Sequence, residues 1–307
     1  MVSAVALFRR LAVVTALFAY LQIALGGLVR VSGSGLGCPD WPLCHGRPYP
    51  PADVHAIIEY SHRAIGSVTG ILIIATVVMA WVVFRTRRPR VAWLATASLI
   101  GIVGEGVLGG VVVAHDLAPW LVLAHLALAM MILGFLIATA VMAMRPSDGV
   151  PSAAFRRLTA LATGATFVMI LTGSTVVASG ADRLCRSWPV CGNGFQLDFA
   201  GVNAYAMLHR SAVLVIGLLL LYVLTTAVRR WRTEPVGVYA LATLSVFVAQ
   251  IAVGAGAAIT DAAFFNGLHV ALATLVWAGM LSTALLTLPR ADGTPELSRL
   301  SVERSSA

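Results

Sequence analysis

Charged side chains are scarce in this sequence of 307 residues. Only 11% of the residues are Asp, Glu, Lys or Arg, whereas 59% are hydrophobic, and the mean hydropathy is +0.90. A typical soluble domain is charged at about a quarter of its positions. Lysine is absent, so the net charge of +8 comes from 21 arginines set against 13 acidic residues. These deficits exclude an ordinary soluble protein.

The apolar residues are gathered into runs of about 20 residues, the length at which an α-helix crosses a bilayer. Eight such runs lie at 8–30, 58–84, 92–114, 119–144, 156–179, 204–228, 236–260 and 265–288. The sequence therefore predicts an all-α, multi-pass protein of the cell membrane with eight transmembrane helices. A cleaved signal peptide is the alternative for the first run, but its length and the glycine-rich sequence that follows favour a retained helix.

Arginines gather at alternate connections between these runs. They are Arg9, Arg10, the arginines of 85–90, Arg145, Arg156, Arg157, the arginines of 229–232, Arg290, Arg299 and Arg304. Positive residues stay on the cytoplasmic side of a membrane, so both chain termini are predicted to be cytoplasmic. This distribution indicates orientation in a membrane, and no nucleic-acid partner is expected.

The four cysteines lie in the two long connections that would face outward. Cys38 and Cys44 belong to 31–57, and Cys185 and Cys191 belong to 180–203. An extracytoplasmic location permits disulfide formation. Because both pairs have the same spacing and compartment, we expect the disulfides Cys38–Cys44 and Cys185–Cys191; unpaired thiols are the alternative.

The second half of the sequence repeats the first. The motif C-x-x-W-P-x-C occurs at 38–44 and at 185–191, and the His-Arg pair at 62–63 recurs at 209–210, 147 positions later. Asp116 and His125 match Asp261 and His269 in the same order. The sequence predicts two tandem four-helix units, 1–147 and 148–307. Four helices per unit give both copies the same direction, so a pseudo-two-fold axis should run along the membrane normal.

The odd-numbered runs share a polar residue followed four positions later by glycine. The copies are Gln22 with Gly26, Glu105 with Gly109 and Gln250 with Gly254, and Met169 with Gly173 is a degenerate fourth. Small residues on one helix face allow the close approach of another helix or of a flat ligand. Helix packing is the commoner of these two explanations.

Four of the seven histidines lie near the predicted outer ends of the even-numbered runs: His62, His125, His209 and His269. A lone intramembrane histidine is more often a packing residue, but two per repeat at equal depth indicate paired imidazoles inside each four-helix unit. Zinc usually needs a third or fourth protein ligand. Haem iron takes two axial histidines, so we expect two haem sites near the outer face.

Arg63 and Arg210 follow two of these histidines directly. A guanidinium is a planar, bidentate donor that suits a haem propionate. Anchoring at the membrane interface is the alternative reading of either arginine.

The two copies differ in their ionisable groups. Glu59 is one helical turn before His62, where the second copy has Ala206, and Glu105 corresponds to Gln250. A carboxylate beside an iron ligand is suited to proton transfer. The first half is therefore predicted to carry out chemistry on its porphyrin, while the second half holds an electron-transfer haem.

The ordered set of motifs resembles the haem A synthase family. It comprises LQIALGGLVRVSGSGLGCPDWPLC (21–44), EYSHR (59–63), His125, LHR (208–210) and LH (268–269). The resemblance implies oxidation of the C8 methyl of haem O to a formyl group by two successive hydroxylations, which supplies haem A to terminal oxidases. One departure is Glu105, where a glutamine is expected.

The resemblance also implies roles for individual residues. His62 and His125 would bracket the substrate haem O, with Glu59 as an acid–base or charge-stabilising group and Cys38 and Cys44 involved in the reaction or its redox coupling. His209 and His269 would ligate a haem b cofactor, and Cys185 and Cys191 would be structural. The implied partners are haem O synthase, membrane lipid and an electron donor or acceptor such as a quinone; a homo-oligomer is left open.

Two other functions compete with this reading. A di-haem b membrane electron carrier linked to quinol explains four histidines, but gives no reason for the loss of Glu59 from one copy. A transporter would use Glu59 and Glu105 as a proton path and would bind its substrate near the membrane midplane.

Overall fold

The structure is a computed structural model that describes residues 2–144, 150, 152–191 and 198–289. Within these ranges the chain is helical, with no strand. The helices are α1 (Val2–Val31), α2 (Val54–Phe84), α3 (Pro89–Ala114), α4 (Pro119–Met144), α5 (Ala153–Ala178), α6 (Ala181–Leu184), α7 (Asn203–Arg230), α8 (Pro235–Thr260) and α9 (Ala263–Thr287).

Eight of these helices, all except α6, are long and apolar enough to cross a membrane. They coincide with the eight predicted runs and confirm the all-α, multi-pass prediction. Two details differ: α1 begins at Val2 instead of at position 8, and the four-residue α6 was not predicted. Arg145, Arg290, Arg299, Arg304 and the predicted boundary at 147/148 lie outside the described residues.

Local start signals place several of the helix ends. The side chain of Asp53 accepts a hydrogen bond from the Ala56 N–H (2.9 Å) at the start of α2, and Ser152 accepts one from Phe155 N (3.2 Å) at the start of α5. These contacts satisfy donors that the first helical turn leaves free. Pro89 and Pro235 open α3 and α8, where a missing N–H costs nothing.

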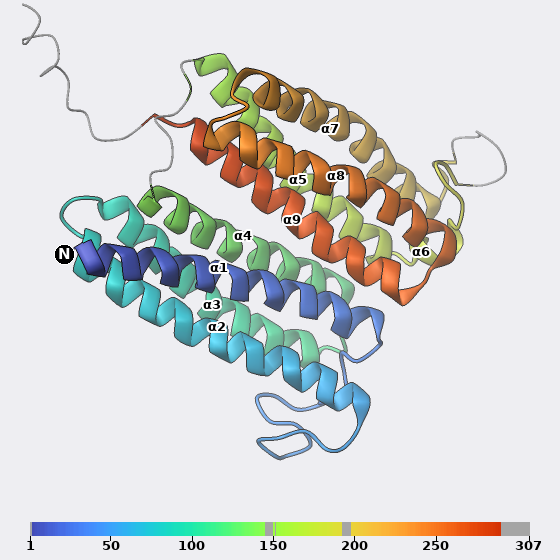
Figure 1. Cartoon of the computed structure of the whole chain (residues 1–307). Coiled ribbons are helices and arrows are strands. Elements are labelled where there is room, and N and C mark those ends of the chain that lie inside the picture. The colour runs from blue at the N-terminus through green and yellow to red at the C-terminus, as the bar shows by residue number, and fades with distance from the viewer. Residues whose placement is uncertain (1, 145–149, 151, 192–197, 290–307) are drawn as a thin grey trace, which may run out of the picture.

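The eight long helices pack in two groups of four (Figure 1). In the first group α1 contacts α2, α2 contacts α3, α3 contacts α4, and α4 closes the ring on α1. The second group repeats this cyclic order with α5, α7, α8 and α9. The groups meet where α9 packs against α1 and α4, and where α5 contacts α4.

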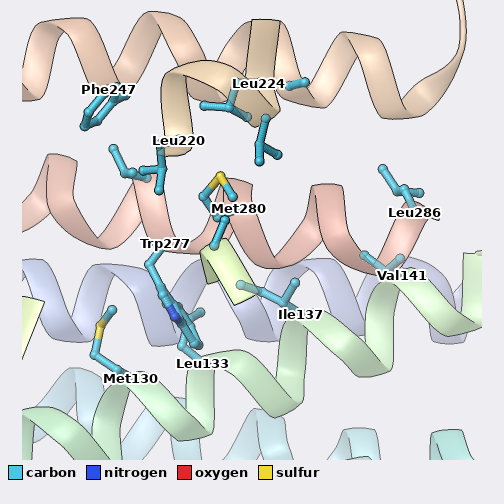
Figure 2. Close-up of a cluster of buried hydrophobic side chains, with 14 of the residues drawn as sticks. Met130, Leu133, Ile137, Val141, Leu220, Leu224, Phe247, Trp277, Met280 and Leu286 are labelled. Atoms are coloured by element: carbon cyan, nitrogen blue, oxygen red, sulfur yellow. The ribbon is translucent and has the colours of Figure 1, made fainter. Parts of the chain in front are cut away.

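One apolar core joins the two groups (Figure 2). Leu133 and Ile137 of α4 pack in the same cluster as Leu220 of α7 and Trp277 of α9. Trp277 is 6% exposed and lies directly on Gly134, because a Cβ on that glycine would be only 2.5 Å from its ring. The two groups are therefore held together by interdigitated side chains. In both groups the histidines lie toward the same end of the helices.

The long connection between α1 and α2, and the segment around α6, lie at the end of the molecule opposite the N-terminus (Figure 1). Both cysteine pairs belong to these two segments. Each histidine of interest lies in the part of its helix nearest this end. The residues singled out from the sequence are thus gathered at one end of the helices.

Candidate functional site

Each of the four histidines lies against a glycine of the long helix that precedes it in the sequence. A Cβ built on that glycine would lie close to Cε1 of the imidazole, at 3.2 Å for Gly26 and His62, 3.3 Å for Gly109 and His125, 2.9 Å for Gly173 and His209, and 2.8 Å for Gly254 and His269. Such distances are shorter than ordinary contacts. The glycine of the repeated pattern therefore makes room for an imidazole ring on the helix backbone.

Each histidine also has a polar neighbour on the same preceding helix. The contacts are Gln22 Nε2 to His62 Nε2 (3.2 Å), Glu105 Oε1 to His125 Nδ1 (3.1 Å), Thr172 Oγ1 to His209 Nδ1 (3.0 Å) and Gln250 Nε2 to His269 Nδ1 (3.0 Å). One polar group thus lies against each ring: three of the contacts are hydrogen bonds, whereas Glu105 approaches His125 without hydrogen-bond geometry. In three of the four cases this group is the polar residue of the repeated pattern.

Thr172 was missed in the sequence analysis. The pattern pointed to Met169, which is apolar, whereas the hydroxyl that reaches His209 comes from Thr172 three residues later. Positions i and i+3 share a helix face, so helical periodicity contains the signal that would have found it.

The histidines form two pairs, one in each group of helices. His62 and His125 are close enough for a charge on one ring to be felt at the other, and the same holds for His209 and His269. Each pair brings together imidazoles from two different helices, α2 with α4 and α7 with α9. The repeat thus places two equivalent donor sets in the two groups.

Several buried polar atoms around these pairs have no hydrogen-bond partner: Gln22 Oε1, His62 Nδ1, Glu105 Oε2, His125 Nδ1 and Gln250 Oε1. Buried polar atoms are normally satisfied. Among the described residues no cluster of three or more His, Cys, Asp or Glu side chains is placed to hold a bare metal ion. Two imidazoles with spare polar atoms beside them fit haem, whose iron has four nitrogens of its own and accepts two axial histidines.

The connection between α1 and α2, the first cysteine loop, is closed by the disulfide Cys38–Cys44 and held by two side chains of α2. The carboxylate of Glu59, which is 4% exposed, accepts a hydrogen bond from Cys38 N (2.8 Å) and forms an ion pair with Arg63. Glu59 therefore contacts the disulfide loop directly.

Arg63 is occupied by the same loop. Its Nη1 donates to the carbonyl oxygens of Asp40 and Leu43 (both 2.6 Å), and its Nη2 donates to the carbonyl oxygen of Cys38 (2.7 Å). With Glu59 these acceptors use both terminal nitrogens.

The second cysteine loop, around α6, has the disulfide Cys185–Cys191 but a weaker attachment. Arg210 donates to the carbonyl oxygens of Cys185 (3.2 Å) and Pro189 (3.4 Å). Ala206 takes the place of Glu59, and Cys191 N donates to the sulfur of Met207 (3.5 Å). The two predicted disulfides are both formed, in different surroundings.

A turn inside the first loop is organised by Asp40. Its carboxylate accepts hydrogen bonds from the backbone N–H groups of Gly46 (2.8 Å) and His45 (2.5 Å). These bonds, that of Gly46 most of all, hold the pKa of Asp40 below its ordinary value.

An open apolar cavity of about 330 Å³ lies between this loop and α3. Trp41 forms one wall, and Val107 and Gly110 are among the residues of the other. Gly110 directly follows the glycine that faces His125. The cavity therefore lies on a face of α3 next to the face that carries the glycine opposite His125.

Fold and site together define a class: a multi-pass helical membrane protein with two pairs of partly buried histidines at one end and two disulfide loops beside them. The sequence profile of the cytochrome oxidase assembly protein family (COX15-CtaA) matches residues 9–56 and 52–281. This chain belongs to that family.

Curated relatives agree with this assignment. A protein of Alkalihalophilus pseudofirmus is 29% identical over 289 residues, covering 90% of this chain and 96% of the relative. One of Exiguobacterium sibiricum is 31% identical over 243 residues (75% and 79%), and one of Shouchella clausii is 28% identical over 237 residues (74% and 78%). All three are named Heme A synthase.

Proposed function

We propose that the chain is a haem A synthase, an oxidoreductase that converts the C8 methyl group of haem O to a formyl group. The observation that carries this proposal is the double set of partly buried imidazoles, each seated on a glycine and in contact with a polar neighbour. Family membership and the names of the relatives support it.

The two halves would have different roles. We assign haem O, the substrate, to His62 and His125, and a resident haem b to His209 and His269. The acidic side chains support this assignment, because Glu59 and Glu105 lie in the first half and are replaced by Ala206 and Gln250 in the second. The resident haem supplies electron transfer when it is bound.

The chain's own residues would orient both groups and exclude water. Glu105 and Thr172 hold the rings of His125 and His209 from the neighbouring helix. The disulfide loops close the outer end, where Cys38 and Cys44 lie nearer to the reacting half than Cys185 and Cys191. Arg63 and Arg210 would face the propionates from the inner side of these loops.

The proposal includes an orientation and partners. The arginine-bearing ends, with both termini, would be cytoplasmic, and the cysteine loops would be extracytoplasmic. The two four-helix units would be related by a pseudo-two-fold axis along the membrane normal. Haem O synthase would supply the substrate within the lipid, and a quinone-class partner would exchange electrons; a homo-oligomer of the chain is compatible with this arrangement.

The direct test is to express the chain with a source of haem O, purify it and identify the extracted porphyrins by chromatography and mass. Haem A or its hydroxymethyl precursor beside haem b is the expected result. Haem b alone would overturn the proposal. His209→Ala should remove haem b, and an unchanged haem content would move the cofactor out of the second half.

A further inference from the structure

The first cysteine loop is fastened to α2 by charged groups. Glu59 accepts the Cys38 N–H and pairs with Arg63, which in turn donates to three carbonyl oxygens of the loop. Hydrogen bonds to a charged group are about twice as strong as neutral ones. Glu59 is thus the single anionic acceptor on which the loop and the guanidinium converge.

The far side of the same loop reaches α3. A Cβ on Gly110 would lie 3.0 Å from the ring of Trp41, so the indole rests on the helix backbone there. Because α2 carries His62 and α3 carries the glycine that faces His125, the loop bridges the two sides of the first histidine pair. The position of the loop therefore affects the space around the first histidine pair.

The second loop provides an internal comparison. It has the same spacing between its cysteines, and its cysteines are equally buried, at 3% and 1% exposed against 0% for both cysteines of the first loop. What it lacks is the carboxylate: Ala206 replaces Glu59, and the hydrogen bonds of Arg210 measure 3.2 Å and 3.4 Å in place of 2.6–2.7 Å.

We infer that Glu59 is a positioning residue that clamps the Cys38–Cys44 loop over the first histidine pair through Cys38 N–H and Arg63. This deepens the proposed function, since the first pair is the proposed substrate site, but the clamp itself is independent of any reaction. The presence of a carboxylate at position 59, where the second copy has Ala206, is then explained by the fixed loop.

The clamp has a measurable consequence. The sulfurs of Cys38 and Cys44 are buried, so a reductant reaches them only when the loop opens. Removal of the charged acceptor favours opening, and each tenfold change in the opening equilibrium corresponds to about 1.4 kcal/mol. Loss of a hydrogen bond to a charged group costs a free energy of at least about that size.

The experiment follows both disulfides in one sample. The full-length protein in lipid nanodiscs is treated with dithiothreitol, free thiols are alkylated at intervals, and mass spectrometry of the peptides measures the reduction of each disulfide separately. The variants are Glu59→Ala, Glu59→Gln and Arg210→Gln. A further control is Glu234→Gln, an exposed glutamate outside this network, beside the start of α8.

Glu59→Ala should accelerate reduction of Cys38–Cys44 about tenfold and leave Cys185–Cys191 unchanged. Glu59→Gln retains an acceptor for the Cys38 N–H and should fall between the alanine variant and the wild type. Arg210→Gln should accelerate only the second disulfide, and Glu234→Gln neither.

Equal acceleration of both disulfides by Glu59→Gln, or a wild-type rate in Glu59→Ala, would overturn the clamp. If Glu59→Ala does not yield folded protein, the selectivity of Glu59→Gln decides the question alone. Selective acceleration in a chain that produces no haem A would keep the clamp and reject the proposed function.

Discussion

Oε1 of Glu105 lies 3.1 Å from Nδ1 of His125, a contact between neighbouring helices deep in the first group. Of the four histidine contacts this is the one made by a carboxyl group; the others come from the amides of Gln22 and Gln250 and the hydroxyl of Thr172. A carboxylate placed this close to a ligating histidine orients the ring and increases its donor strength once it accepts the ring N–H. His125 is therefore set apart from its three equivalents.

Glu105→Gln converts this contact into the type found at His269. Because loss of such an outer partner costs about 10- to 100-fold in metal affinity or activity, we expect turnover of haem O to fall by about tenfold. Haem b content should stay unchanged. Product analysis measures the turnover, and a titration with haem O followed by absorbance measures the affinity for the substrate. Gln250→Glu is the matched change in the other half. If Glu105→Gln keeps the wild-type affinity for haem O and the wild-type turnover, Glu105 has no part in the site.

Gly173→Ala tests whether the glycines exist to seat the imidazoles. The added methyl would lie 2.9 Å from Cε1 of His209, so the ring must move. Haem b content, measured on purified protein, should drop severalfold. Gly164→Ala is the control on the same helix, where a Cβ meets nothing within 4 Å. Alanine favours a helix over glycine by up to about 1 kcal/mol, so neither variant should lose helical stability. Equal haem content in both would refute this role.

Thr172→Val replaces the hydroxyl that contacts His209 Nδ1 by a methyl of similar size. The ring loses its restraint while the packing is preserved, so haem b should remain bound with an altered absorption spectrum and midpoint potential. Thr175→Val is the control, because the Thr175 hydroxyl bonds to the backbone of its own helix. A redox titration identical to that of the wild type would show that Thr172 does not orient the ligand.

The eight helices could be predicted because a bilayer requires long apolar runs, and this requirement is visible in the sequence itself. The pairing of the histidines followed from the repeat. The link between Glu59 and Cys38 N–H could not be predicted in the same way, because it depends on the path of a loop that returns across α2. The sequence suggested that Glu59 acts next to His62, whereas its bonds in the structure go to Arg63 and the loop.

The second disulfide differs from the first in lacking a carboxylate beside it, and this predicts a purely structural role. Removing both thiols with Cys185→Ser and Cys191→Ser should lower the free energy of unfolding by about 2 kcal/mol, the chain-entropy value for so short a loop. The apparent Tm in detergent should fall, and turnover below that temperature should remain near the wild-type value. The matched change, Cys38→Ser with Cys44→Ser, should lower Tm and turnover together. Loss of turnover in the Cys185 and Cys191 variant, with Tm and haem content preserved, would instead place the second pair in the reaction.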